Sequence, residues 1–293
     1  MELIIGNWIA TSIIYRKRDT VIYNASLIRP VNSEYIYDIN QDTKWVLKVV
    51  YEGRPHKSLE IQTIEELHLY DIPYSIKMPD HKKNRIGVIS NGSWYAMEKY
   101  DDTLRHSVEF ANNNFKLLCL NIIDLLEWFH IEKKVVHGDV KVDNILVNRS
   151  NTTRPFCLID YELVDRPSNT ICMHNLPNGY YYYGLGCDPH ESYSSFRMDL
   201  QAFGYMLWSI LVSNGVNNNK LKLFRFQIFA FEYYAKNTRQ NILYELEIIK
   251  MNESLNKPPI IKQYFDIIEN LPWVAKTAKP EIYTQLKELF NKN

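Results

Sequence analysis

The stretch that decides the fold is His137-Gly138-Asp139-Val140-Lys141-Val142-Asp143-Asn144-Ile145-Leu146-Val147. After a short polar interval the chain continues with Leu158-Ile159-Asp160-Tyr161-Glu162. Each half joins a short apolar run, which is typical of a strand, to charged or amide side chains that we expect on a loop. Loops carried by paired strands are places where polar side chains converge. The stretch therefore predicts a polar site at the ends of two neighbouring strands.

The residue types in this stretch suit phosphoryl transfer. That reaction needs a carboxylate to orient the attacking hydroxyl, oxygen ligands for a metal ion and a cation on the migrating group. Asp139, Asp160, Asn144 and Lys141 supply these groups. The alternative is a polar turn whose aspartate and asparagine side chains only cap the backbone. The fixed residue types and spacing favour the first interpretation.

Amphipathic helices are predicted on both sides of this stretch. Apolar residues between Phe115 and Phe129 recur every three or four positions, and the same spacing begins again near Asp199. The segment 221–293 predicts further helices with asparagine-rich connections. We therefore expect a larger, mostly helical second part.

The first hundred residues have a different pattern. Short β-branched and aromatic runs separated by turn residues predict strands. These runs are 8–15, 20–23, 45–51, 86–89 and 94–97. One helix is predicted at 58–67, where Leu59, Ile64 and Leu67 have helical spacing. The chain is therefore expected to be α+β, with a small β-rich part that carries one main helix and a boundary near residue 100.

Composition limits the classes of function. The 293 residues are 46% hydrophobic and 23% charged, which is typical of a globular protein. Lys+Arg and Asp+Glu both number 34, so the formal net charge is zero and wholesale binding to nucleic acid or to an anionic membrane is not expected. The four cysteines form no C-x-x-C pair, which argues against a zinc site. No apolar run is long enough for a membrane span, and no leader peptide is expected.

Lys48 is unusual because it interrupts the apolar run 45–50. An ammonium group there is costly unless an anion meets it, although a lysine near a strand end can also extend to water. Glu60 is the best candidate partner, since helical spacing turns it with Leu59 and Ile64 toward the sheet. Glu65 and Glu66 are nearby alternatives.

The pattern H-x-D-x-K-x-x-N followed by D-[FY] resembles the protein-kinase superfamily, and narrower features resemble its vaccinia-related kinase family. Those features are Gly138 where most kinases have arginine, Tyr161, the runs 183–190 and 196–205, and Lys279-Pro280-Glu281-Ile282-Tyr283. The similarity extends from about Ile4 to the last helix. Poxviruses carry active and inactive members of this family, and the richness in Asn, Ile, Lys and Tyr agrees with an AT-rich viral genome.

The resemblance implies a bilobal protein-kinase fold and a serine/threonine protein kinase that uses ATP and Mg2+. The implied domains are an N-lobe at 1–96, a hinge at 97–101 and a C-lobe at 102–293. By the same resemblance Asp139 accepts the proton of the substrate hydroxyl, and Lys141 holds the transferred phosphoryl group. Asn144 and Asp160 bind Mg2+.

The implied ATP site draws on the first part of the chain. Lys48 binds the nucleotide phosphates and pairs with Glu60. Met97 lies at the back of the adenine pocket, and the backbone of the segment that includes Glu98 and Tyr100 holds the adenine. A methionine at a strand end is also ordinary core, so the assignment of Met97 depends on its position alone.

Two departures from the kinase pattern bear on activity. The loop that should cradle the phosphates is expected within 4–15, which holds one glycine and is shortened between Ile9 and Ile13. Glu162 stands where kinases have glycine, so it removes backbone freedom and adds a negative charge beside the metal ligand. Gly138 has a different consequence, because it removes the arginine that grips a phosphorylated loop. Activity is therefore not expected to depend on such phosphorylation.

Three functions remain open from the sequence. The first is an active protein kinase with weak nucleotide affinity, and the second is a pseudokinase that binds and regulates partners. The third is a small-molecule kinase of the aminoglycoside or choline type, against which Lys141 argues.

Partners and location follow from the resemblance. The expected partner is a protein substrate or a regulated protein, and typical family targets are small chromatin-associated proteins such as barrier-to-autointegration factor. We expect a monomer that binds neither nucleic acid directly nor a membrane. The expected location is the cytoplasm, the host cytoplasm for a viral protein, with the nucleus as an alternative.

Overall fold

The computed structural model describes residues 3–31, 34–36, 44–72, 75–166, 195–213, 258–271 and 278–292. The chain divides into two compact units. Unit 1 comprises Met1–Asp101 with Ile159–Glu162, and unit 2 comprises Asp102–Leu158 with Leu163–Asn293. The sequence run at 183–190 lies outside the described residues. The predicted α+β architecture, β-rich first and helical afterwards, is confirmed.

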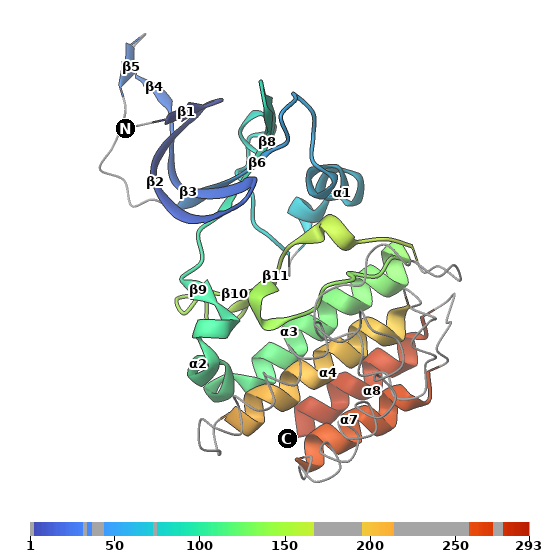
Figure 1. The fold of residues 1–293 in the computed structure, drawn as a ribbon. Helices are drawn as coiled ribbons and strands as arrows, with labels where there is room; N and C mark the ends of the chain where they lie inside the picture. Colours follow the sequence, from blue (N-terminus) through green and yellow to red (C-terminus); the bar gives the residue numbers. More distant parts are fainter. Residues whose placement is uncertain are drawn as a thin grey trace, which may run out of the picture. The chain divides into compact units, whose positions relative to one another are not determined.

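Unit 1 is built on a curled antiparallel sheet of six strands in the order β1-β2-β3-β6-β8-β7 (Figure 1). The strands are β1 (Leu3–Ile5), β2 (Trp8–Lys17), β3 (Thr20–Leu27), β6 (Trp45–Tyr51), β7 (Ile86–Ile89) and β8 (Gly92–Glu98). A separate hairpin pairs β4 (Arg29–Val31) with β5 (Glu34–Ile36). The predicted strands at 45–51 and 86–89 have the observed bounds. Strand β2 runs further than predicted because its pairing continues to the tight turn at 18–19, and β3 runs further at its other end, where residues 24–27 pair with the start of β2.

The sheet core explains why these runs become strands. Alternating residues of β2, β3 and β6 point to one face and pack around Trp8 and Trp94, both nearly inaccessible to solvent. Aromatic and β-branched residues suit such a half-buried, pleated surface. Burial of this face therefore fixes the pairing register that places Lys48 between Ile22 and Tyr95.

Helix α1 (Leu59–Leu67) is the one α-helix of unit 1 among the described residues. Ser58 caps its start by accepting a hydrogen bond from the Ile61 backbone, and His68 ends it in the left-handed conformation. Leu59 was expected on the buried face but is 62% exposed, because the buried stripe consists of Glu60, Ile61, Thr63 and Ile64. The buried face of the helix therefore differs from the predicted face by part of a turn.

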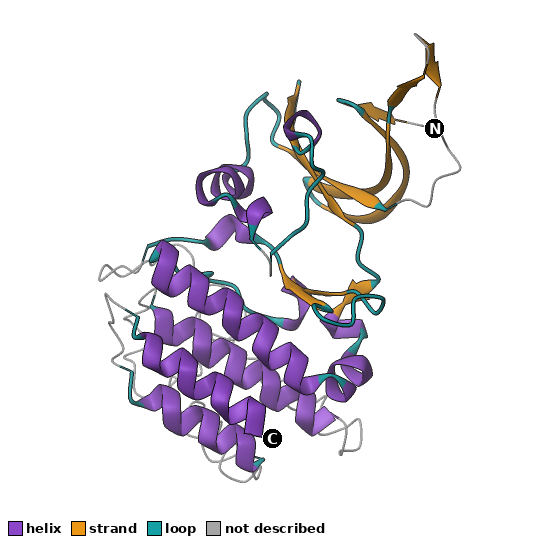
Figure 2. Ribbon diagram, turned by 180° about the vertical axis from the view of Figure 1, so that it is seen from behind, coloured by secondary structure: helices purple, strands orange, loops and turns teal. Residues whose placement is uncertain are grey.

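Unit 2 is mainly helical (Figure 2). Its described α-helices are α2 (Val108–Asn113), α3 (Phe115–Glu127), α4 (Phe196–Ser213), α7 (Pro259–Glu269) and α8 (Pro280–Lys292), and a π-helical segment η4 (Trp128–Lys133) continues α3. Helix α3 packs on α8, and α7 packs on both α4 and α8. A small sheet joins β9 (Asp102–Thr103), β10 (Ile145–Val147) and β11 (Phe156–Leu158).

Short one-turn 3-10 helices complete the described elements. They are η1 (Leu69–Asp71), η2 (Lys82–Asn84), η3 (Leu104–His106), η5 (Val142–Asn144) and η6 (Tyr161–Leu163). Throughout the described part of the chain, no helix combines the length and the apolar character needed to cross a membrane.

Candidate active site

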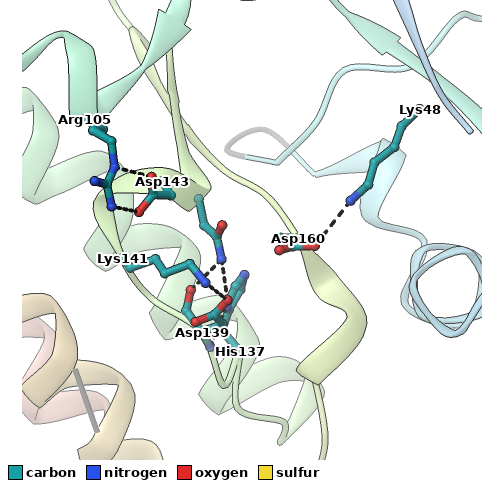
Figure 3. Close-up of polar contacts among 8 residues, drawn as sticks. Lys48, Arg105, His137, Asp139, Lys141, Asp143 and Asp160 are labelled. Carbon is teal, nitrogen blue, oxygen red and sulfur yellow. Dashed lines mark hydrogen bonds and ion pairs between the residues drawn. The ribbon is translucent and has the colours of Figure 1, made fainter. Parts of the chain in front are cut away.

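Lys48 lies in the middle of β6 and meets two carboxylates. Its Nζ is 2.7 Å from Oε2 of Glu60 on α1 and 3.3 Å from Oδ1 of Asp160. Figure 3 shows the contact between Lys48 and Asp160. All three residues belong to unit 1, because Ile159–Glu162 joins that unit although it lies far along the chain. The lysine is therefore paired in the protein's interior, not extended to water.

Tyr95 completes this group, which we call the Lys48 cluster (Lys48, Glu60, Tyr95 and Asp160). The Tyr95 hydroxyl donates a 2.9 Å hydrogen bond to Oε1 of Glu60, so both oxygens of this buried carboxylate have partners. The start of α1 is tied to the sheet because the Ser58 backbone N–H donates to Oγ of Ser93. This anchoring fixes the position of Glu60 relative to Lys48.

The electrostatics of the Lys48 cluster keep the lysine charged. Burial by itself lowers the pKa of Lys48, but the negative charges of Glu60 and Asp160 outweigh it and raise the pKa well above its ordinary value. Burial raises the pKa of Tyr95, and the charge of Glu60 raises it further, so the phenol stays a neutral donor. Of the neighbouring glutamates, Glu65 pairs instead with Lys57.

Asp160 has an unusual backbone conformation. Its φ of 73° lies in the left-handed region, which aspartate tolerates better than most side chains. The next residue, Tyr161, is fully buried, and its hydroxyl lies 2.7 Å from Oγ of Ser75. Glu162 follows in a 3-10 turn without a positive φ. Glycine's conformational freedom is therefore not used at position 162, which answers the backbone part of this departure, while the added negative charge of Glu162 remains.

The second group, the Asp139 cluster (Asp139, Lys141 and Asn144), belongs to unit 2. The Asn144 amide donates to the Asp139 backbone oxygen at 2.9 Å and to its Oδ2 at 2.8 Å. The Lys141 ammonium binds the same Oδ2 (Figure 3). Asp139 and Asn144 are buried, whereas Lys141 is partly exposed. The cluster therefore holds one carboxylate between a cation and an amide, with Oδ1 outside these contacts.

A buried network beneath this loop fixes its backbone. Asp199 of α4 accepts hydrogen bonds from the backbone N–H of His137 at 2.6 Å and of Gly138 at 3.0 Å. The same carboxylate meets Nε2 of His130 at 2.9 Å, and the other nitrogen of His130 contacts the Tyr283 hydroxyl. Burial alone raises the pKa of Asp199, yet His130 and the donors at His137 outweigh it and lower the pKa. From the sequence, Asp199 is predicted only to lie near the start of a helix.

Gly138 must be glycine in this arrangement. Its φ is +82°, and a Cβ at this position lies 2.6 Å from the carbonyl oxygen of Leu163. An arginine, as most kinases have here, does not fit without displacing that segment. The chain just before Gly138 and the chain just after Leu163 are also joined, by an antiparallel backbone bridge between Val136 and Asp165.

Met97, Glu98 and Tyr100, predicted to hold the adenine, lie at the end of β8 and just beyond it. Met97 is buried two residues after Tyr95, so it shares the sheet face of Lys48. The Glu98 backbone N–H donates to the Lys77 oxygen at 2.8 Å, and its side chain lies 4.0 Å from Lys44. Tyr100 is partly buried. The adenine-binding roles of these residues stay predictions.

The predicted location of the phosphate loop is wrong. Residues 8–17 form one continuous strand, so no loop interrupts 9–13. The connection that borders the Lys48 strand is instead the two-residue turn Arg18–Asp19 between β2 and β3. Arg18 has a φ of 46°, and the Asp19 oxygen accepts a 2.7 Å hydrogen bond from the Tyr51 backbone. The turn carries no glycine, so a glycine pattern in the sequence does not mark it.

Each cluster, taken separately, contains oxygen donors of the kind that Mg2+ takes. Within the described residues, no group of three or more His, Cys, Asp or Glu side chains lies close enough to hold a metal ion. Mg2+ typically takes one or two carboxylate oxygens together with phosphate oxygens and water. Asp160 offers a carboxylate, and the Asn144 amide oxygen is not used by the contacts of its nitrogen with Asp139.

Sequence reasoning missed several residues that support these clusters. Tyr95 was detectable, since it pairs with Lys48 across the sheet and alternates with Met97. The role of Asp143 was also missed: its carboxylate binds the Arg105 guanidinium through two contacts (Figure 3). His130 and Tyr283 gave no sequence signal, because they are 153 residues apart in the chain.

Comparisons with known proteins were made for the whole chain. No protein-family model matches it. Among solved structures, it is similar to one described as the structure of the Cydia pomonella granulovirus kinase PK-1, with 18% sequence identity, a TM-score of 0.46 and 70% of each chain covered. A likeness this distant carries no argument about function, which therefore depends on the residues of the two clusters.

Proposed function

We propose that this protein is a serine/threonine protein kinase that transfers the γ-phosphoryl group of ATP to a protein hydroxyl. The observation that carries the proposal is the Lys48 cluster: a buried lysine paired at 2.7 Å with a helix glutamate and at 3.3 Å with Asp160, which comes two residues after β11. A charged lysine between two carboxylates, with the Asp139 cluster on the same chain, is the inventory that phosphoryl transfer requires.

Each residue has a proposed role. Lys48 binds nucleotide phosphates while Glu60 and Tyr95 hold its position, and Asp160 and Asn144 hold Mg2+. Magnesium-bound ATP supplies the phosphoryl group and a charge that offsets the phosphate oxygens. Asp139 orients the substrate hydroxyl and accepts its proton, and Lys141 balances the negative charge of the phosphoryl group. The products are ADP, the phosphorylated protein and a proton.

A second function, a pseudokinase that regulates a partner protein, is favoured by one observation. The Arg18–Asp19 turn replaces the glycine-rich backbone that usually cradles the phosphates. In this case the Lys48 cluster serves structure alone. The two functions differ in a single measurable property, which is transfer of phosphate.

The test is transfer of labelled phosphate from ATP and Mg2+ to a basic protein substrate. We expect Asp139→Asn to reduce the rate about 1000-fold, since it removes the group that accepts the proton. Asp266→Asn is the matched control, because Asp266 is exposed on α7 and this variant is expected to keep the wild-type rate. Wild-type protein that transfers no more phosphate than Asp139→Asn contradicts the kinase proposal and supports the pseudokinase.

A further inference from the structure

Strand β2 has a long unpaired edge. On its outer side β1 pairs only with residues 8–10, while β2 continues to Lys17. No other described strand pairs with residues 11–17 on that side. This edge, which we call the β2 edge, extends over seven residues, and its pairing with β3 on the inner side is shifted at residues 11 and 14. An open edge offers backbone donors and acceptors to another extended chain.

The β2 edge is also apolar. Seven large hydrophobic side chains are strongly exposed in the described residues, and five of them lie on β1 and β2. Those five are Leu3, Ile4, Ile13, Ile14 and Tyr15, with exposed fractions between 43% and 58%. Exposed apolar side chains that gather at one place mark interaction sites, whereas single ones need no explanation. Ile13, Ile14 and Tyr15 belong to the β2 edge, whereas Leu3 and Ile4 lie on the neighbouring strand β1, so β1 and β2 together carry most of the strongly exposed apolar side chains of the described residues.

The charges at the end of the β2 edge select the partner. Residues 16–19 are exposed at the hairpin tip. Three of them, Arg16, Lys17 and Arg18, are basic, and one, Asp19, is acidic. A second copy that runs antiparallel places its own tip at the opposite end of the edge, and brings only Thr11 and Ser12, with no acidic group, beside Arg16–Arg18. An acidic segment is complementary to the tip, which speeds association and favours binding.

The opposite edge of the sheet lacks these properties. Strand β7 has four residues, and Val88 is its one strongly exposed large apolar side chain. Its neighbour η2 packs against it. The contrast gives a natural control within the same sheet.

From these observations we propose that the β2 edge binds an extended segment of a partner protein by strand addition, with apolar residues along 11–15 and acidic residues at the basic tip. The segment runs antiparallel to β2, as every pairing in this sheet does, so its acidic residues come first. Main-chain hydrogen bonds provide affinity in this mode of recognition, and side-chain contacts provide specificity. The proposal does not depend on phosphoryl transfer.

The test uses a labelled, acetylated peptide with the sequence Asp-Glu-Asp-Val-Thr-Val-Thr-Val and the full chain. Fluorescence anisotropy at low salt is expected to give a dissociation constant on the order of 10 µM. Replacement of the three acidic residues by lysine is expected to abolish binding. Amide hydrogen exchange of residues 11–17 is expected to slow when the peptide binds, since strand addition protects backbone N–H groups.

Three protein variants separate the contributions. R16E/K17E/R18E is expected to weaken binding at least about tenfold, and the loss shrinks as salt rises. Ile13→Lys with Ile14→Lys is expected to weaken binding by a similar factor. Val88→Lys is the matched control on the other edge, with affinity within about twofold of wild type. Circular dichroism and melting temperature verify that each variant folds.

Three results overturn the proposal. The first is the absence of saturable binding up to about 1 mM peptide. The second is binding that Val88→Lys weakens as much as the β2 variants do. The third is a dimer in sedimentation velocity that Ile13→Lys with Ile14→Lys dissociates, while the peptide fails to bind. That outcome assigns the β2 edge to a second copy of this chain.

Discussion

The loop around Asp139 and the turn between β2 and β3 differ in how strongly folding holds them. In the loop, Asp139 and Asn144 are buried and their neighbours are tied to Asp199 inside unit 2. In the turn, residues 16–19 are exposed, and the Asp19 backbone contact to Tyr51 is a main-chain bond that needs no particular side chain. Changes at the buried positions Asp139 and Asn144 are therefore expected to cost stability, whereas the turn accepts new side chains.

The loop in unit 2 is therefore fixed by buried side chains, whereas the turn in unit 1 is fixed by main-chain contacts. Packing and buried hydrogen bonds constrain sequence even where activity does not. Stability and phosphoryl transfer therefore require separate measurements.

The largest effect is expected for Asp199→Asn. The substitution removes the charge beside His130 and leaves one backbone N–H of the loop facing an amide donor. Breaking such a buried pair costs about 3–5 kcal/mol of unfolding free energy. Urea denaturation measures it, with Asp266→Asn as the surface control. A loss equal to that of the control contradicts the claim that folding holds the loop through Asp199.

The same residue gives a pH dependence. The native pKa of Asp199 lies below its ordinary value of 3.8, so the unfolded chain takes up the proton first as the pH falls. Its stabilisation is therefore fully present above about pH 5 and is lost as the pH falls through 3.8 toward the native pKa. The stability difference between wild type and Asp199→Asn is expected to shrink in that range. A constant difference from pH 7 to pH 3 contradicts the assignment.

Gly138→Ala is expected to have the next largest effect, about 2–3 kcal/mol. The new methyl group meets both an unfavourable φ and the Leu163 oxygen at 2.6 Å. Gly53→Ala is the matched control, because Gly53 has a similar φ of +72° with no atom within 4 Å. That control is expected to cost about 1 kcal/mol. Equal losses in thermal or urea unfolding show that the loop is not tightly packed.

Lys48→Met tests the Lys48 cluster by nucleotide affinity. Loss of the ammonium is expected to weaken binding of ATP with Mg2+ about tenfold, which a displacement assay with a fluorescent nucleotide measures. Lys44→Met is the control, since Lys44 is exposed and lies just before the same strand. Unchanged affinity in Lys48→Met means that the lysine serves structure, as in the pseudokinase.

Tyr95→Phe is expected to give the smallest effect. It removes the hydroxyl that donates to Glu60 and leaves Lys48 in place. Nucleotide affinity is expected to fall about threefold in the same assay, because Glu60 is then less firmly positioned. Tyr23→Phe is the control. Within the part of the chain that the structure describes, the Tyr23 hydroxyl has one hydrogen-bond partner, the Tyr51 hydroxyl at 3.3 Å. A loss as large as that of Lys48→Met indicates that Tyr95 does more than position Glu60.

The sequence was sufficient for features that depend on local patterns. The α+β architecture followed from the change between period-two and helical spacing near residue 100, and the strand at 45–51 has its observed bounds. The contacts within 139–144 are also local, since they span five residues or fewer. The sequence spacing was therefore enough to predict that these residues lie close together.

Features that depend on distant contacts were missed. Asp199 reaches His137 across 62 positions, and the Tyr95 hydroxyl reaches Glu60 across 35. On α1, Glu60 and Ile64 are buried as predicted, but Leu59 is exposed although its apolar character favoured burial. The phosphate loop was misplaced because glycine was used as its marker, and the Arg18–Asp19 turn has none. Buried polar residues and replaced turns leave little trace in hydrophobic patterns.

The most direct test of the central claim is the dependence of phosphoryl transfer on ATP concentration. A protein that keeps the transfer residues but lacks a glycine-rich cradle is expected to transfer phosphate with half-saturation at about 1 mM ATP or above, near the upper end of the usual range. Asp139→Asn is expected to abolish the signal across that range. Absence of wild-type transfer at any ATP concentration contradicts the claim, and so does saturation at low micromolar ATP.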